Sequence, residues 1–281
     1  MSVNESIDKV VAFYDAHPIN EEQILHALAA RNIALDALSE ELLKDHDQDH
    51  FGGLEANDIL IAAAGFRKGQ RVLDVCSGMG GPARYLAHRV GCEVVGLDFT
   101  ESRHRGAQRL TKLTGLDHLV SHRHGNALDM PFENASFDGA MGQEAWCHVP
   151  EKPRLIAECA RVVKSGGVIA FTDILCTQQL SRAEMTRLGD EMTFPTLETF
   201  DGYVQLLRDH GCTIERRDDL GAQWAQILIA RLAMYRSLRA DTERKFGAAH
   251  YRKWDDTYAF FVGLYGEGKL TGGRFIARKA P

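Results

Sequence analysis

Short apolar runs alternate with amphipathic segments through the middle of the chain, and we predict that these runs are strands. Strands separated by helices of about 10–15 residues are typical of a parallel sheet with helices on both faces. The predicted strands lie at residues 71–75, 93–97, 119–123, 137–141, 167–173, 213–217 and 274–277.

The segments that flank this alternation are mainly helical. Apolar residues recur at helical spacing before residue 60, at 21–44 for example, and again at 178–210 and 222–266. We therefore expect one α/β domain with a helical N-terminal lid and an inserted cap. Its predicted parts are a lid at residues 1–60, a core at 61–177, and cap helices with the last two strands at 178–281.

Charge and hydropathy exclude two classes of partner. Lys and Arg total 33 and Asp and Glu total 39, so the formal charge is −6, and the basic residues are scattered. A nucleic-acid-binding protein usually shows a basic balance or a basic stripe, so we expect no nucleic-acid partner. No run approaches the roughly 18 apolar residues of a membrane-spanning helix, so we expect no membrane partner.

The cysteines and the N-terminal residues suggest a cytoplasmic protein. The six cysteines form no C-x-x-C pair and no zinc-ligand spacing, which is the pattern of reduced thiols. The first residues lack a basic segment followed by an apolar core, so we expect no secretory signal. The sequence does not determine the oligomeric state, and a homodimer is one option.

A glycine-rich turn follows the first predicted strand. In the segment Val72–Ala83, Ser77, Gly78 and Gly80 come directly after the apolar run and before a helix. Such a turn lets a ligand approach backbone amides and the positive end of a helix. Asp98 ends the next strand, where an acid binds ribose hydroxyls. The spacing also satisfies the dinucleotide pattern, so a nicotinamide-dependent oxidoreductase and a turn without ligand are alternatives.

Two further features favour a different ligand. Asp74 lies just before the turn, where a carboxylate would pair with a cationic amine but would repel a pyrophosphate. Asn126 and Ala127 follow the third strand, and their amide and backbone groups suit the exocyclic amine and a ring nitrogen of adenine. Both features weigh against a nicotinamide cofactor.

At this point the sequence resembles the class I S-adenosylmethionine-dependent methyltransferases. The resemblance is carried by VLDVCSGMGG, EVVGLD, GNALDMPF and GGVIAFTD, in that order. It implies a Rossmann-like, seven-stranded, mostly parallel sheet and S-adenosylmethionine as the cofactor. Cys76 and Asn126 stand where the family usually has a glycine and an acid. The predicted cofactor contacts are His50, Phe51, Gly53, Asp74, Ser77, Gly78, Gly80, Asp98, Phe99, Asn126, Ala127 and Gln143.

A narrower resemblance is to the sarcosine/dimethylglycine and phosphoethanolamine N-methyltransferases. It rests on HFGGLEA at residues 50–56, GQEAWCH at 142–148 and GKLTGG at 268–273. By position it implies that Glu144 and His148 are a catalytic pair. Four residues apart in a helical turn, the two would face one side. His148 would accept the proton of an amine while Glu144 orients the imidazole or the ammonium. A helix cap or a core histidine is the alternative for His148.

The acceptor predicted from these residues is a small amine. Residues 193–198 contain neither Arg nor Tyr, and without a cationic clamp phosphoethanolamine is disfavoured relative to a sarcosine- or dimethylglycine-like acceptor. Methylation of a sulfur or a phenolic oxygen, and a non-catalytic S-adenosylmethionine-binding protein, are the alternatives. We expect Tyr14, Trp146 and Tyr203 to line the substrate pocket, although aromatic residues at helical spacing are often core.

An acid- and histidine-rich run at residues 45–50 contains the residue types and the spacing of a metal site. Methyl transfer from a sulfonium needs no metal, and the run adjoins the glycines at 52–53. We therefore predict no metal.

Overall fold

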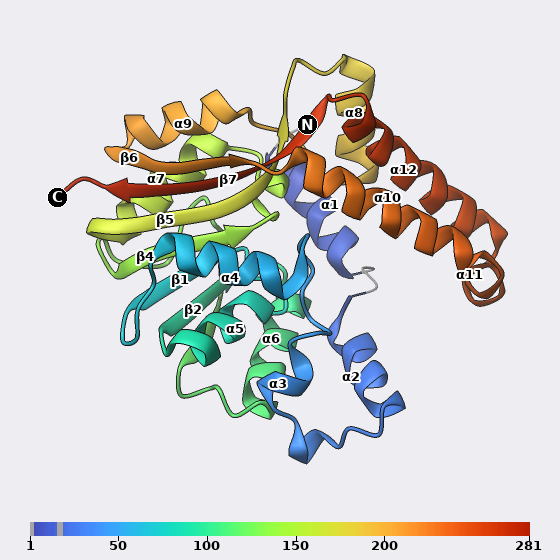
Figure 1. The fold of residues 1–281 in the computed structure, drawn as a ribbon, viewed down its shortest axis with the longest axis horizontal. Coiled ribbons are helices and arrows are strands. Elements are labelled where there is room, and N and C mark those ends of the chain that lie inside the picture. Colours follow the sequence, from blue (N-terminus) through green and yellow to red (C-terminus); the bar gives the residue numbers. More distant parts are fainter. Residues whose placement is uncertain (1–2, 16–18) are drawn as a thin grey trace.

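The computed structural model describes residues 3–15 and 19–281 and contains one seven-stranded sheet. Residues 1–2 and 16–18 of the predicted lid lie outside the described residues. The strand order is β3-β2-β1-β4-β5-β7-β6 (Figure 1). The strands are β1 (Arg71–Val75), β2 (Glu93–Asp98), β3 (Val120–His124), β4 (Phe137–Gln143), β5 (Val163–Cys176), β6 (Cys212–Asp219) and β7 (Leu270–Lys279).

The sheet is mostly parallel, which confirms the predicted fold class. Strands β1 to β5 pair in parallel, and β7 runs antiparallel to its neighbours β5 and β6. Strands β5 and β7 are longer than the apolar runs predicted, because they pair with each other from Val168–Arg278 to Cys176–Leu270. Backbone pairing along a long neighbour extends a strand beyond its apolar part.

Alternate residues of the strands supply two separate cores, one on each face of the sheet. Leu73 packs in the core shared with α7 (Lys152–Val162) and α9 (Phe200–Asp209). Its neighbour Val72 packs in the core shared with α4 (Gly53–Ala64) and α5 (Gly81–Val90). The central strands are therefore buried on both faces, which explains their continuous apolar runs.

The lid is built from short helices. They are α1 (Val3–Asp15), α2 (Glu21–Ala30), the 3-10 helix η1 (Leu35–Ala37) and α3 (Glu40–Leu43). The continuous helix expected at 21–44 is wrong, because Asn32 has a left-handed φ of 59° and ends the first part. Apolar residues of α2 and α3 pack on Leu110 of α6 (Glu101–Leu113).

The first lid helix, α1, connects the core to the cap. Ser102 of α6 donates a hydrogen bond to Asp15 over 2.5 Å, and Lys9 pairs with Asp190 of α8 (Arg182–Glu191) over 2.6 Å. The ring centroids of Phe13 and Trp254 lie 6.2 Å apart. Helix α1 therefore closes one side of the space between core and cap.

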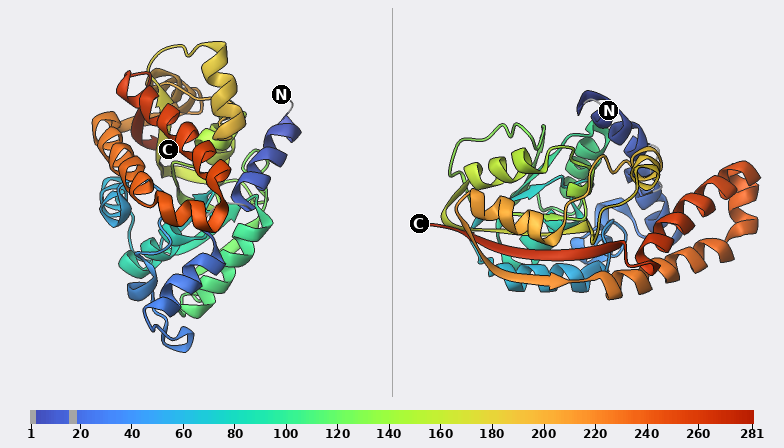
Figure 2. Two further views of the ribbon diagram at one scale, coloured as in Figure 1. Left: turned by 90° about the vertical axis from the view of Figure 1, so that its right-hand side faces the viewer. Right: turned by 90° about the horizontal axis from the view of Figure 1, so that it is seen from above.

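The cap helices project beyond the sheet as an arm (Figure 2). The arm consists of α10 (Gly221–Ser237), α11 (Arg239–Phe246) and α12 (Ala248–Gly266). The single helical stretch expected at 222–266 is interrupted at Leu238 and at Gly247, whose φ is +88°. Within the described ranges, no helix is both long enough and apolar enough to cross a membrane.

A buried ion pair fixes the acid-rich segment 45–50 against the core. Arg84 of α5 is fully buried, and its Nη2 lies 2.5 Å from Oδ2 of the buried Asp47. A Cβ at Gly81 would lie 2.5 Å from the Asp47 carbonyl oxygen, so this close approach requires glycine at 81. The lid segment is thereby held directly over the start of α5.

Candidate active site

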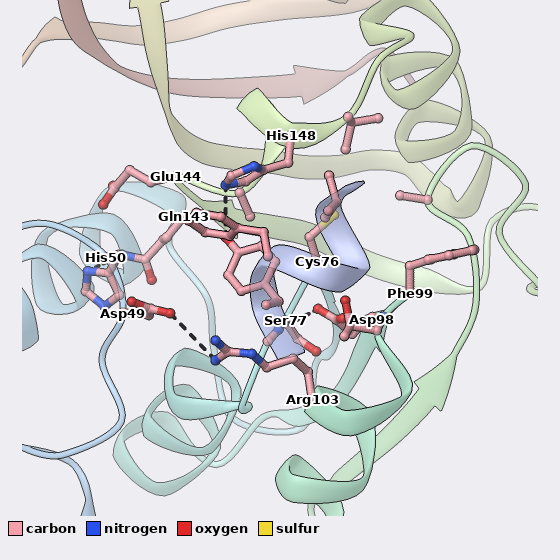
Figure 3. A pocket seen from close by; sticks show the side chains of 18 of the residues that line it. Asp49, His50, Cys76, Ser77, Asp98, Phe99, Arg103, Gln143, Glu144 and His148 are labelled. Carbon is pink, nitrogen blue, oxygen red and sulfur yellow. Dashed lines mark hydrogen bonds and ion pairs between the residues drawn. The ribbon is translucent and has the colours of Figure 1, made fainter. Parts of the chain in front are cut away.

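A cavity of about 270 Å³ lies at the carboxyl end of the parallel strands. Its walls come from the turns after β1, β2, β3 and β4, from α1 and the segment 47–51 of the lid, and from the cap helices. Figure 3 shows labelled side chains of the lid segment, of the ends of β1, β2 and β4, and of α6 (Glu101–Leu113) around it. In open parallel sheets, ligands bind outside the carboxyl ends of the strands, at such a position.

The glycine turn after β1 is held by Asp98 at the end of β2. Oδ2 of Asp98 accepts the Gly78 N–H over 2.7 Å, and Oδ1 accepts the Thr100 N–H over 2.8 Å. Burial raises the pKa of Asp98, and these two backbone hydrogen bonds oppose that rise. Cys76 has a left-handed φ of 62°, a conformation that L residues other than glycine rarely adopt. Asp98 thus couples two neighbouring strand ends in one rigid turn.

Asp74 presents an uncompensated carboxylate beside this turn. It is only 3% exposed, and its buried Oδ2 has no hydrogen-bond partner among the described residues. Burial, and secondarily the nearby Asp98, raise the pKa of Asp74 to about 7. A cationic ligand group would relieve this cost by stabilising the ionised form.

The outer part of the cavity carries the groups predicted for a purine. Asn126 and Ala127 line it after β3, and Oδ1 of Asn126 already accepts the Leu128 N–H over 2.9 Å. The Phe99 ring is 39% exposed at the same end. A planar apolar ligand group placed there would be covered by an aromatic ring.

The structure brings most of the predicted cofactor residues to one cavity. The predicted cofactor residues that line this cavity are His50, Phe51, Asp74, Ser77, Gly78, Asp98, Phe99, Asn126, Ala127 and Gln143.

Gly53 and Gly80 do not line the cavity, and their predicted contacts with the cofactor stay predictions. Gly80 precedes the first turn of α5 with φ +75°, and a Cβ there would lie 2.6 Å from Cε1 of His122. Gly53 begins α4 with φ +55°. Both glycines allow backbone turns that L side chains rarely adopt.

His148 is hydrogen-bonded at both ring nitrogens. Its Nδ1 lies 2.9 Å from Oγ1 and 3.2 Å from the carbonyl oxygen of Thr193, in the cap. Its Nε2 lies 2.9 Å from the hydroxyl oxygen of Tyr14, in the lid. Since a carbonyl only accepts, the Nδ1–H tautomer fits best, and Nε2 then accepts the phenol proton. Burial raises the pKa of Tyr14 well above its usual value, so the phenol is neutral.

Glu144 and His148 both line the cavity, but the predicted contact between them is wrong, and an orienting role of Glu144 toward the ammonium stays a prediction. Glu144 has a left-handed φ of 48°, and only Trp146–His148 form a 3-10 turn (η2), so the two side chains do not share a helical face. Oε2 of Glu144 accepts the Phe51 N–H, and Oε1 accepts the Thr172 hydroxyl over 2.7 Å. Burial raises the pKa of Glu144 to about 7. Glu144 therefore holds the lid segment to the sheet.

Trp146 and Tyr203 do not line the cavity, so the prediction that they contact substrate is corrected. Trp146 is fully buried, stacks on Phe171 at 4.1 Å and donates its Nε1–H to the Val75 carbonyl. Tyr203 is also fully buried and donates its hydroxyl proton to Asp173 over 2.7 Å. Both rings are core residues, as aromatic residues at helical spacing often are. Tyr14 does line the cavity.

Several residues that line the cavity were not predicted from the sequence. They are Phe13, Arg103, Arg231, Tyr258 and Phe261. Arg103 stands in the first turn of the helix after Asp98, and that position is a signal that could have been used. The residues of α10 and α12 belong to no motif, so only the fold brings them to the cavity.

The acid- and histidine-rich run makes structural contacts within the lid and with α5. Asp47 pairs with Arg84, and Nε2 of His50 lies 3.0 Å from Oε1 of Gln48. In the part of the chain that the structure describes, no group of three or more His, Cys, Asp or Glu side chains is arranged to hold a metal ion.

Comparison with known proteins identifies the central part of the chain. Residues 73–171 match the family model described as a methyltransferase domain. Sarcosine/dimethylglycine N-methyltransferase of Halorhodospira halochloris is 34% identical over 140 residues, which is 50% of each chain. The chain covers half or less of the length of the first curated relatives that it matches.

Two solved structures share the fold. One is a putative sarcosine dimethylglycine methyltransferase from Galdieria sulphuraria, with a TM-score of 0.74, 22% identity, and coverage of 81% of this chain and 85% of that one. The other is phosphoethanolamine N-methyltransferase 2 of Haemonchus contortus in complex with phosphomonomethylethanolamine and S-adenosylhomocysteine. Its TM-score is 0.75, with 19% identity and coverage of 90% of this chain and 59% of that one. At such identities the likeness establishes the fold alone.

Glu144→Ala is expected to release the lid segment around Phe51. A hydrogen bond to a charged acceptor contributes about 1.5–3 kcal/mol, so the Phe51 amide should exchange its hydrogen about 10- to 100-fold faster. Hydrogen–deuterium exchange of a peptide spanning this residue measures the effect. Glu144→Gln, which keeps an acceptor oxygen, is the control and should exchange more slowly than Glu144→Ala. Unchanged exchange in Glu144→Ala would contradict the anchoring role.

Proposed function

We propose that this chain, whose residues 73–171 match the model of a methyltransferase domain, transfers the methyl group of S-adenosylmethionine to a small amine. The observation that carries the proposal is that one cavity holds the glycine turn with its two acids and the hydrogen-bonded pair of Tyr14 and His148. A donor site and a proton acceptor thus share one enclosed space. Cytoplasmic location and the domain boundaries near residues 60 and 177 remain predictions.

The cavity fits the methyl donor at three places. Asp98, fixed by two backbone amides, suits the ribose hydroxyls, and the Asn126–Ala127 turn with Phe99 suits the adenine. Asp74, buried with an oxygen that lacks a partner, suits the ammonium of the methionine part. When bound, S-adenosylmethionine would supply an activated methyl group: a C–N bond to the acceptor would form as the C–S bond breaks, and S-adenosylhomocysteine would leave.

The acceptor side favours a compact amine. Phe13, Tyr14, Phe194, Tyr258 and Phe261 line the cavity near His148, and aromatic faces attract a methylated ammonium by about 0.5–2 kcal/mol each. The sarcosine/dimethylglycine relative supports an acceptor of this class.

Tyr14 and His148 are suited to remove the proton of the amine. An ammonium has no lone pair, so it must be deprotonated before it can attack. The Tyr14 oxygen can accept the amine proton while its own proton moves over the 2.9 Å hydrogen bond to Nε2 of His148. Thr193 holds Nδ1 and keeps the imidazole in the required orientation. The lid and cap exclude water and align the reactants.

His148→Ala is expected to lower turnover and to leave the affinity for the donor product nearly unchanged. Loss of a general base costs about 10²- to 10⁴-fold in kcat. The measurement is S-adenosylhomocysteine formation with dimethylglycine as acceptor, with calorimetric binding of S-adenosylhomocysteine in parallel. Asp98→Ala is the opposite control, because it should weaken binding more than it slows turnover. Full activity of His148→Ala would refute the base assignment.

Donor binding is expected to weaken below neutral pH through Asp74. A bound cation favours the ionised carboxylate, whereas free Asp74, with its pKa at about 7, is mostly protonated at pH 6. Since binding must then expel a proton, the Kd of S-adenosylhomocysteine should rise about 10-fold between pH 8 and pH 6. Asp74→Asn should bind more weakly, with a flatter pH dependence. Equal slopes in the two proteins would contradict this role.

A further inference from the structure

Arg103 is a buried cation in the cavity that makes no hydrogen bond with the described residues. Its side chain is 3% exposed, and its Nε and Nη2 are buried without a partner. The contacts it does make are an ion pair at 3.7 Å, from Nη1 to Asp49, and a stack of the guanidinium 4.8 Å from the Tyr14 ring centroid. Burying a charged donor without an acceptor is costly unless a ligand supplies one.

The unsatisfied atoms of Arg103 lie on one edge of the guanidinium. Nε and Nη2 carry N–H groups that point in the same direction, and this edge binds a carboxylate through two parallel hydrogen bonds. Figure 3 shows the ion pair of Arg103 with Asp49, which Nη1 makes. Nε and Nη2 are therefore the donors that remain without an acceptor. A carboxylate is the anion whose geometry matches this edge.

The same cavity contains a second buried group with an unpartnered atom, and this group is an acid. Asp74 has a carboxylate oxygen without a partner and lines the cavity as Arg103 does. A carboxyl group with one unpartnered oxygen and a guanidinium with two unpartnered nitrogens together match a ligand with one ammonium and one carboxylate. The methionine end of the donor carries both.

We propose that Arg103 binds the carboxylate of the methionine part of the donor, opposite Asp74, which binds its ammonium. The proposal rests on the proposed function, because it names the part of the donor that this subsite holds. Since Arg103 also stacks on Tyr14, donor binding would fix the lid tyrosine that contacts His148. Arg103 is a binding residue in this account and takes no part in proton transfer.

The test compares two ligands on matched variants by calorimetry. The ligands are S-adenosylhomocysteine and its decarboxylated analogue, which keeps the amine. For the wild-type protein, removal of the carboxylate should weaken binding about 10- to 100-fold. For Arg103→Met, removal of the carboxylate should weaken binding less than about 3-fold. For Arg103→Lys, the loss of affinity should be intermediate. Arg105→Met is the control, since Arg105 is 75% exposed on the same helix and pairs with Glu101.

The results of this experiment distinguish a failure of the Arg103 assignment from a failure of the proposed function. An equal loss of affinity in wild type and Arg103→Met would overturn the assignment, as would normal donor affinity in Arg103→Lys with a raised KM for dimethylglycine alone. That second result would assign the arginine to the acceptor. If the wild-type protein binds neither adenosyl ligand, the proposed function fails. If Arg103→Met does not fold, Arg103→Lys and Arg103→Gln provide the same comparison.

Discussion

The ion pair between Arg84 and Asp47 is the contact on which the site depends. Both side chains are buried, and the pair joins the lid segment to the helix that starts at the glycine turn. Replacing Arg84 would leave the buried Asp47 carboxylate without its cation, at a cost of about 3–5 kcal/mol. The segment held in this way contains Asp49, His50 and Phe51, which form one wall of the cavity. The glycine turn alone would be an open groove.

Closure of the cavity also depends on contacts made from three directions. Glu144 at the end of β4 holds the Phe51 amide, Tyr14 reaches His148 from α1, and Thr193 reaches it from the cap. The imidazole is therefore oriented only when lid and cap are both in place. In the proposed mechanism, this arrangement would link the exclusion of water to the orientation of the proton acceptor.

Local patterns in the sequence predicted the sheet and the donor side well. Apolar runs identified all seven strands, and residues next to strand ends, such as Asp74, Asp98 and Asn126, lie at the cavity because parallel strands end at one edge. Predictions failed where side-chain direction depended on the backbone or on distant packing. The left-handed φ of Glu144 turns it away from His148, and the packing on Phe171 removes Trp146 from the cavity. No local pattern reveals that Arg103 would be buried beside Tyr14.

The central claim is that this cavity transfers a methyl group to a small amine. The most direct measurement is mass spectrometry of a reaction with S-adenosylmethionine that carries a deuterated methyl group, and with sarcosine, dimethylglycine and phosphoethanolamine present together. We expect the label on sarcosine or dimethylglycine and none on phosphoethanolamine. A label on phosphoethanolamine, or no labelled acceptor from a protein that binds S-adenosylhomocysteine, would contradict it.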